Sequence, residues 1–302
     1  MPNSAPSAPG YRATGFALAA GAVLLFSIRP ILIKLAYGYA RDPVTLIALR
    51  MVFSLPFFVI AAVASQRRSE APMSRADLRR IVLLGILGYY AASFLDFLGL
   101  QYITAGLARL LLFLYPTIVV LLSWFVMRRA ASMREVLALV LSYIGLAIVM
   151  ARSVEGQHEH LALGAALVFA SAVAYAVYLV AGTEIIRRVG SVRFTALALT
   201  VASLCCVVQF FLLRPIEALV LPWEVYALAL AMAIGCTVLP TFMTAEGLKR
   251  IGANQVAIVG AVGPVSTIAL GWVGLDERMT ATQIGGALLV LLGVLLVSVK
   301  PK

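Results

Sequence analysis

The sequence predicts an all-α polytopic membrane protein whose ten transmembrane helices form a 5+5 inverted repeat. Three observations predict this class. Of the 302 residues, 63% are hydrophobic and 12% are charged, which is about half the charge of a soluble domain, and the mean hydropathy is +1.02. Apolar stretches of about 20 residues, each long enough to cross a bilayer, recur along the chain. One residue pattern also occurs twice, 148 positions apart.

Ten apolar spans follow one another, and short segments with turn or helix-breaking residues separate them. The predicted spans cover residues 13–36, 43–64, 79–100, 104–127, 133–151, 161–182, 192–213, 223–247, 253–275 and 281–299. Residues 1–12 precede them, are rich in Pro, Ser and Ala, and are expected to form a disordered tail. The first apolar run has no persuasive cleavage site, so we interpret it as a span and not as a signal peptide.

The positive charges predict the orientation of the chain. When the N-terminus is placed in the cytoplasm, most Lys and Arg flank the cytoplasmic ends of the spans. The opposite side then carries only Arg41, Arg152, Arg214 and Arg278. Because Lys and Arg are retained on the cytoplasmic side, both termini are predicted to be cytoplasmic, in a bacterial inner membrane. The net charge of +11 is explained in this way, and no nucleic-acid partner is expected.

The repeated pattern indicates internal symmetry. The stretch "GLQYITAGLARLLLFLYP" at 99–116 returns as "GLKRIGANQVAIVGAVGP" at 247–264, and Trp124 corresponds to Trp272. Five spans separate the copies, which is an odd number, so the second copy is predicted to be upside down. The loop charges agree, because "QY" in the copy facing outward becomes "KR" in the copy facing inward.

The chain therefore divides into two halves. We predict a first five-helix repeat at 13–151, a periplasmic linker at 152–160 and a second five-helix repeat at 161–299. Such inverted repeats are typical of transporters that work by alternating access.

Several features resemble the drug/metabolite transporter superfamily, EamA type. They are the ten spans, the inverted halves, the stretch "DPVTLIALR" at the second span, and the pattern Ala-x10-Pro-x7-Trp in the fourth and ninth spans. The resemblance covers almost the whole chain and is closest to YddG-like exporters of amino acids. It implies a basket of helices one, three, four, six, eight and nine around a central cavity, and outward transport of small metabolites.

Ionisable residues inside the spans are the first candidates for a functional site, because each costs about 2.5–3.5 kcal/mol at the membrane centre. They are Arg29, Lys34, Arg50, Asp96, Arg109 and Glu246. Asp96 and Arg109 are equally far from the turn between the third and fourth spans, so they are predicted to form an ion pair. That pair is either a structural clamp or part of a substrate or proton site.

Arg29 and Arg50 are also predicted to lie at one depth, on neighbouring helices. An Arg fork suits a carboxylate, so the two either hold the carboxylate of an amino acid or similar anion, or bond backbone carbonyls at helix breaks. The family resemblance implies a fold role for Arg50 and Lys34, which leaves Arg29 for specificity. Glu246 is expected to pair with Lys249 or Arg250 at a helix end.

Two prolines and three tyrosines complete the candidate site. Pro116 and Pro264 fall in mid-span, where each removes a backbone hydrogen bond, and they are interpreted either as hinges or as kinks that shape packing. Tyr115 and Tyr175 are too deep for an interfacial belt and are candidates for cavity lining, and Tyr178 shares a helix face with Tyr175.

These observations predict a secondary transporter that exports small metabolites, most of all amino acids. The alternatives are transport of another small organic anion or drug-like compound, a channel, and a membrane-embedded enzyme. The two histidines, His158 and His160, lie in one loop, and no metal-ligand spacing, nucleophile elbow or phosphate-binding loop occurs. We therefore expect no enzyme activity, no metal and no cofactor. The expected partners are the small-molecule substrate and the lipid bilayer, with the chain a monomer or weak homodimer.

Overall fold

The computed structural model describes residues 9–67, 73–127, 132–155, 160–260 and 262–298. Every regular element in these ranges is helical, and they contain no strand. The predicted all-helical class is therefore confirmed for this part of the chain. Residues 1–8 of the predicted tail and 156–159 of the predicted linker lie outside the described residues. Residues 9–12, which were expected to be disordered, belong instead to the first helix.

The first half of the chain forms five helical spans. They are α1 (Pro9–Tyr37), α2 (Pro43–Arg67), the continuous run α3 (Arg75–Gly85), η1 (Ile86–Ala91) and α4 (Ala92–Gly99), the broken span α5 (Ala105–Leu112) with α6 (Tyr115–Met127), and α7 (Met133–Glu155). Segment η1 is a π-helical turn inside the third span. The predicted boundaries lie within a few residues of these.

Residues 161–298 form a second series of helices. It contains α8 (Leu161–Val189), α9 (Ser191–Leu213), a short 3-10 turn η2 (Ile216–Leu219), the run α10 (Trp223–Ala233), η3 (Ile234–Val238) and α11 (Leu239–Gly260), then α12 (Val262–Leu275) and α13 (Ala281–Ser298). Segment η3 is also π-helical. Helix α11 bends at Gly252, whose φ of 80° lies in the left-handed region that favours glycine.

Eight helices of the described chain are long and apolar enough to cross a membrane, and α12 and α13 are shorter apolar helices. A chain with this many apolar helices must satisfy its backbone hydrogen bonds within each helix. Side chains begin several of the helices. Thr104 accepts a hydrogen bond from the Leu107 amide at the start of α5, and Ser74 and Asp77 form a reciprocal capping box at the start of α3.

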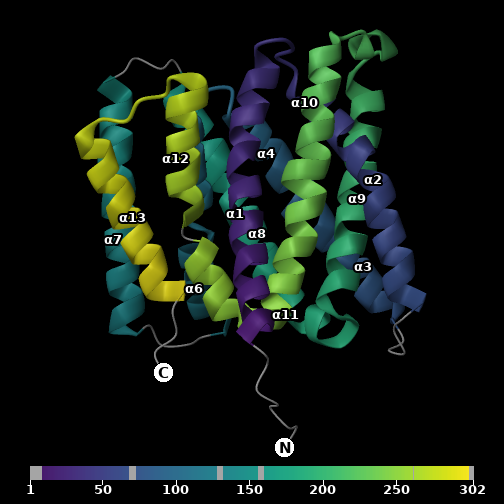
Figure 1. Ribbon diagram of the computed structural model, residues 1–302, viewed down its shortest axis with the longest axis horizontal. Helices are drawn as coiled ribbons and strands as arrows, with labels where there is room; N and C mark the ends of the chain where they lie inside the picture. The colour runs from purple at the N-terminus through teal and green to yellow at the C-terminus, as the bar shows by residue number, and fades with distance from the viewer. Residues whose placement is uncertain (1–8, 68–72, 128–131, 156–159, 261, 299–302) are drawn as a thin grey trace, which may run out of the picture.

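The helices run alternately up and down, as Figure 1 shows. The lower end of the bundle is where α1 begins and α13 ends, and the upper end is where α1 ends and α2 begins. Helix α1 packs mainly on α11 and α12, whereas α8 packs mainly on α4 and α6. The pairs α2 with α9 and α7 with α13 complete the bundle.

Equivalent features recur 148 residues apart. The π-helical turns begin at Ile86 and at Ile234. Helix α7 begins after Ser132, which exchanges hydrogen bonds with Glu135 in the first turn: the side-chain oxygen of each accepts from the backbone amide of the other. Helix α13 begins with the same arrangement of Thr280 and Gln283.

The contact between α7 and α13 repeats in the same way. A Cβ atom at Gly145 would lie 2.5 Å from the Gly286 carbonyl oxygen, and one at Gly293 would lie 2.5 Å from the Ala138 carbonyl oxygen. Gly145 corresponds to Gly293, and Gly286 corresponds to Ala138, so each contact is the counterpart of the other. The helices approach this closely because no side chain stands between them.

Candidate functional site

The upper half of the bundle holds an ion pair between α1 and α4. Arg29 Nη2 donates to Asp96 Oδ2 at 2.8 Å, and the two side chains are 17% and 5% exposed. Nearby, the Tyr37 hydroxyl donates to the Phe97 carbonyl oxygen, which also joins α1 to α4. A charge pair this far from solvent is stable only when the geometry is good, and here the distance is that of a charge-assisted hydrogen bond.

This pair corrects the predicted partner of Asp96, which is Arg29 and not Arg109. Equal distance from a turn places two residues at one depth, but it does not make their side chains face each other. Asp96 points toward α1, and Arg29 reaches it from there. Arg109 stays close enough for an electrostatic interaction with both Asp96 and Arg29.

Arg50 is completely buried in the middle of α2, with 1% of its surface exposed. Its guanidinium carbon lies 4.9 Å from the centre of the Phe97 ring, and its Nε and Nη2 have no hydrogen-bond partner. It interacts electrostatically with Arg29 and Asp96. Stacking on an aromatic ring fixes the guanidinium but leaves its charge uncompensated.

Arg109 extends from α5 toward the start of α12. A Cβ atom at Gly263 would lie 3.3 Å from Arg109 Nη2, so the guanidinium approaches the α12 backbone where that helix has no side chain. Its Nε is buried without a hydrogen-bond partner. Arg109 also interacts with Tyr115 and Tyr175. We call Arg29, Arg50 and Arg109 the arginine cluster.

The predicted cavity tyrosines lie together. Tyr115 and Tyr175 have ring centres 5.2 Å apart, and Tyr175 stacks on Tyr178 at 5.9 Å. Tyr89 joins them from η1, 4.9 Å from Tyr178. Tyr178 is buried against Phe194, whereas the other three are half-buried. These four residues form the tyrosine cluster, and Arg109 connects it to the arginine cluster.

Pro116 lies at the start of a helix and does not kink a continuous one: it is the second residue of α6, after a break at Phe113 and Leu114. Pro264 lies in α12, whose first described residue is Val262, and its role as a hinge or kink stays a prediction. Proline is tolerated in the first turn because its missing N–H would have no helical partner there. Pro30, next to Arg29, lies inside the continuous helix α1, where it removes one backbone hydrogen bond.

A polar contact joins α1 to the start of α12. The Ser27 hydroxyl donates to the Gly263 carbonyl at 3.0 Å, and the Thr267 hydroxyl donates to the Ser27 carbonyl at 3.1 Å. Shifted by 148, Ser27 and Gly263 correspond to Tyr175 and Tyr115. The equivalent positions therefore differ in chemistry. A serine hydroxyl contacts a glycine carbonyl at one of them, and two tyrosine rings are in contact at the other.

Glu277, in the turn between α12 and α13, contacts two other segments at the upper end. Its Oε1 pairs with Lys34 Nζ at 2.8 Å, and its Oε2 accepts from the Ala105 amide at 2.7 Å. One carboxylate thus joins the end of α1 to the start of α5, where the helix dipole also favours a negative charge. A cleft lined by Glu277, Met279, Ile268 and Gly106 lies beside it.

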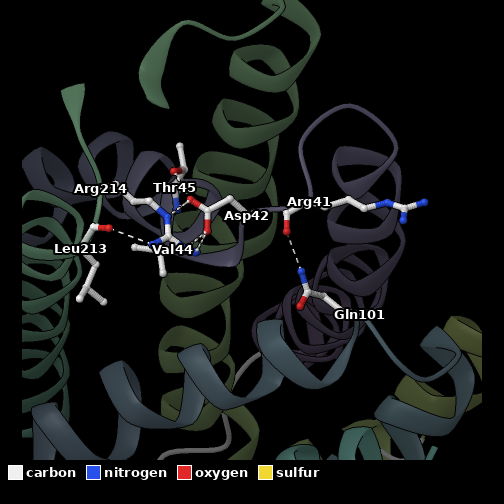
Figure 2. Close-up of polar contacts among 7 residues, drawn as sticks. All are labelled: Arg41, Asp42, Val44, Thr45, Gln101, Leu213 and Arg214. Carbon is white, nitrogen blue, oxygen red and sulfur yellow. Dashed lines mark hydrogen bonds and ion pairs between the residues drawn. The ribbon is translucent and has the colours of Figure 1, made fainter. Parts of the chain in front are cut away.

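A second set of contacts holds the α1–α2 turn, as Figure 2 shows. Arg214 binds both oxygens of Asp42, at 2.8 and 2.9 Å, and Gln101 Nε2 donates to the Arg41 carbonyl at 2.8 Å. Partial burial by itself would raise the pKa of Asp42, but the hydrogen bonds from Arg214 and Thr45 outweigh it and hold that pKa below its usual value.

The lower end has contacts of a different kind. Arg188 pairs with Asp77 at 2.7 Å, which links α8 to α3. Arg250 pairs with Glu246 at 2.8 Å, as the sequence predicted, and stacks on Tyr11 of α1. Among the described residues, α6 packs mainly on α8, α13 and α7, and α11 packs mainly on α1, η3 and α13.

No group of three or more His, Cys, Asp and Glu side chains that could hold a metal ion occurs in the described ranges. His158 lies outside those ranges, and His160 precedes α8. Cys206 and Cys236 are buried free thiols, and Cys205 is half-buried.

Sequence reasoning did not anticipate Tyr89, Ser27, Thr267 or the roles of Glu277 and Arg109. The 148-residue correspondence could have identified Ser27, because it relates this residue to Tyr175, which was already a candidate. The partners of Glu277 could not be found in this way, since they depend on how loops far apart in sequence meet.

Comparison with known proteins gives matches over nearly the whole chain. The model of the EamA-like transporter family matches residues 13–151 and again 162–299. The uncharacterized transporter YcbK of Bacillus subtilis (strain 168) is 27% identical over 290 residues, which is 91% of this chain and 92% of the relative. The uncharacterized transporter sll1319 of Synechocystis sp. (strain ATCC 27184 / PCC 6803 / Kazusa) is 26% identical over 263 residues, covering 84% and 78% of the two chains.

A solved structure, titled "Crystal structure of protein", has a similar fold. It superposes with a TM-score of 0.62 at 21% sequence identity and covers 94% of this chain and 96% of its own. At this identity the likeness concerns the fold alone.

Proposed function

This chain belongs to the EamA-like transporter family, and from that premise we propose that it exports small metabolites, amino acids above all, across a bacterial inner membrane by alternating access and without ATP. One observation carries the proposal most directly. The arginine cluster, with Asp96, lies beside the tyrosine cluster near the start of α6. Charged residues inside membrane helices mark substrate paths by default.

An amino acid fits the three kinds of surface that meet there. The guanidinium of Arg29 or Arg109 suits a carboxylate. The backbone where α5 ends, together with the Ser27 hydroxyl, offers oxygens to an ammonium group. Tyr89, Tyr115 and Tyr175 offer a half-buried apolar surface to a side chain.

We further propose that ten spans form two inverted repeats, 13–151 and 161–299. Support comes from the features that recur 148 residues apart: the two π-helical turns, the two helix caps and the paired glycine contacts of α7 and α13. In this proposal α12 and α13 cross the membrane although they are short.

Alternating access requires two groups of helices that move relative to each other. We assign α1, α11 and α12 to one group and α4, α5, α6 and α8 to the other, because α1 packs mainly on α11 and α12, and α8 packs on α4, α6 and α5; α5 also packs on α12. The described polar contacts between the groups lie in the upper half, and include those of Arg29 with Asp96, Tyr37 with Phe97, and Glu277 with Ala105. These contacts support a conformation closed at the upper end.

The orientation then gives the direction of transport. Most Lys and Arg of the sequence flank the lower end, so we propose that this end is cytoplasmic. A conformation closed at the upper, periplasmic end can take substrate from the cytoplasm, as an exporter must.

The test is flux from proteoliposomes loaded with single amino acids. We expect saturable efflux for the wild type and at least about tenfold weaker apparent affinity for Arg29→Gln, since one charge-assisted contact is lost. The control is Arg278→Gln, which removes an exposed charge at the upper end. No amino-acid flux by the wild type, or unchanged affinity in Arg29→Gln, would reject the amino-acid carboxylate site.

A second candidate is export of another small organic anion or of a drug-like compound. The same arginines favour an anion, and the half-buried tyrosines would accept an aromatic drug-like molecule. A flux screen that includes organic anions and aromatic cations separates these candidates.

A further inference from the structure

The charges in the upper half of the bundle do not balance. Three arginines on α1, α2 and α5 surround one carboxylate, that of Asp96. Elsewhere in the described chain, Asp42, Asp77, Glu246 and Glu277 are paired near helix ends with other cations. The arginine cluster and Asp96 therefore carry two uncompensated positive charges.

Individual guanidinium nitrogens of the arginine cluster lack hydrogen-bond partners. Arg29 Nε, Arg50 Nε and Nη2, and Arg109 Nε are buried and have no hydrogen-bond partner. Arg29 also lies within electrostatic range of both other arginines, so like charges repel across the cluster. Buried charges are normally paired, and the fold pairs only one of these three.

Helix geometry adds to the positive field. Helix α6 begins inside the bundle, at Tyr115, and the start of a helix carries a partial positive charge. Arg109 lies close to the α12 backbone at Gly263. Arg109 interacts electrostatically with two half-buried residues, Tyr115 and Tyr175, and Arg29 interacts with Tyr175 alone of these two.

We propose that the substrate carries two acidic groups, as in a small dicarboxylate or an acidic amino acid, and that Arg109 selects for the second one. Two negative charges neutralise the cluster, whereas a neutral amino acid, whose own charges cancel, leaves both positive charges in place. One acidic group binds Arg109 beside the tyrosine cluster. The other binds Arg29, which has an unused Nε beside its bond to Asp96.

This inference rests on the proposed transport function and narrows its substrate class. L-glutamate and L-glutamine provide the matched probes, because they share size and shape and differ in the second carboxylate. Succinate tests whether the amino group is needed. Binding is measured with the purified full-length protein in detergent, from the shift of its melting temperature with each probe, and flux is measured in proteoliposomes.

We expect glutamate and succinate to bind at least about tenfold more tightly than glutamine, as one charged contact implies. Arg109→Gln should weaken glutamate about tenfold and glutamine less than about twofold, so that the preference disappears. Arg109→Lys should keep part of the preference, because the charge remains. The control Arg278→Gln, which removes an exposed charge beside Asp276, should leave the ratio unchanged.

If Arg109→Gln does not fold, the comparison of probes on the wild type decides alone. Glutamine bound and moved as well as glutamate would overturn the inference and leave amino-acid export standing. Succinate flux without any amino-acid flux would support the two-acid substrate and reject amino-acid export. No flux of any of these probes would overturn both.

Discussion

Arg29 Nη2 lies 2.8 Å from Asp96 Oδ2, and this ion pair joins α1 to α4 across the two groups of helices. The contact couples two functions. It holds the upper end together, and it occupies one side of an arginine that the proposed substrate also needs. Substrate can bind the free Nε of Arg29 while the pair is intact, whereas opening of the upper end requires Asp96 to leave Arg29.

The first prediction concerns the strength of this pair. Asp96→Asn should lower the free energy of unfolding by about 1–3 kcal/mol, because a half-buried guanidinium loses its partner. The double variant Asp96→Asn/Arg29→Gln should lose less than the sum of the single variants. Unfolding in detergent, followed by tryptophan fluorescence, measures both. A larger coupling of Asp96 with Arg109 than with Arg29 would contradict the observed pairing.

The second prediction concerns closure of the upper end by Glu277. Glu277→Gln weakens the link between Lys34 and the Ala105 amide, so the upper end should open more often. In a background without the native cysteines, a cysteine at Met279, which lines the adjacent cleft, should react several-fold faster with a thiol reagent. Arg278→Gln serves as the control, since Arg278 pairs with the exposed Asp276. Equal labelling rates in both variants would show that Glu277 does not hold this end.

The third prediction compares two adjacent glycines of α13. A Cβ atom at Gly286 would lie 2.7 Å from the Gly145 carbonyl oxygen, whereas one at Gly285 would meet nothing within 4 Å. Gly286→Ala should cost about 1–3 kcal/mol through overpacking, and Gly285→Ala should be neutral or stabilise the helix by about 0.5–1 kcal/mol. Melting temperatures of the two variants test this, and similar losses would contradict the close approach of α7 and α13.

The fourth prediction is a pH dependence. The pKa of Asp42 is held below its usual value by Arg214 and Thr45 once burial is overcome, so the carboxylate stabilises the fold above its unfolded pKa of about 3.9. This contribution is lost as the pH falls through the lower, folded pKa. The melting temperatures of wild type and Asp42→Asn should therefore differ at pH 7 and converge as the pH falls to about 3 and below. A difference that persists in acid would argue against the ionised pair.

The fifth prediction tests the orientation. Val220 at the upper end is 84% exposed and Met133 at the lower end is 82% exposed. With single cysteines at these positions and no native cysteines, an impermeant thiol reagent added to intact bacteria should label position 220 and spare position 133. The reverse pattern would place the termini outside and would turn the proposed export into import.

Much of the fold follows from the sequence, because the bilayer allows few solutions. Apolar runs of spanning length must be helical, since no water is present to satisfy their backbone groups, and the boundaries of α2 and α9 were placed within a few residues on that ground. The repeat of Gly99–Pro116 at Gly247–Pro264 likewise needed only the sequence. The grouping of Tyr115 with Tyr175 was anticipated as shared cavity lining, and the pair is in contact.

The tertiary structure decided which charges meet. Depth along a helix can be counted from a turn, but the direction of a side chain depends on how helices rotate and pack. Asp96 was therefore assigned to Arg109 on depth alone, while its partner, Arg29, comes from another helix and lies 67 residues away in sequence. The same reason applies to Glu277, which meets Lys34 and Ala105 only because three distant segments converge. Composition and periodicity determine that such a bundle forms, and side-chain packing between helices determines its electrostatics.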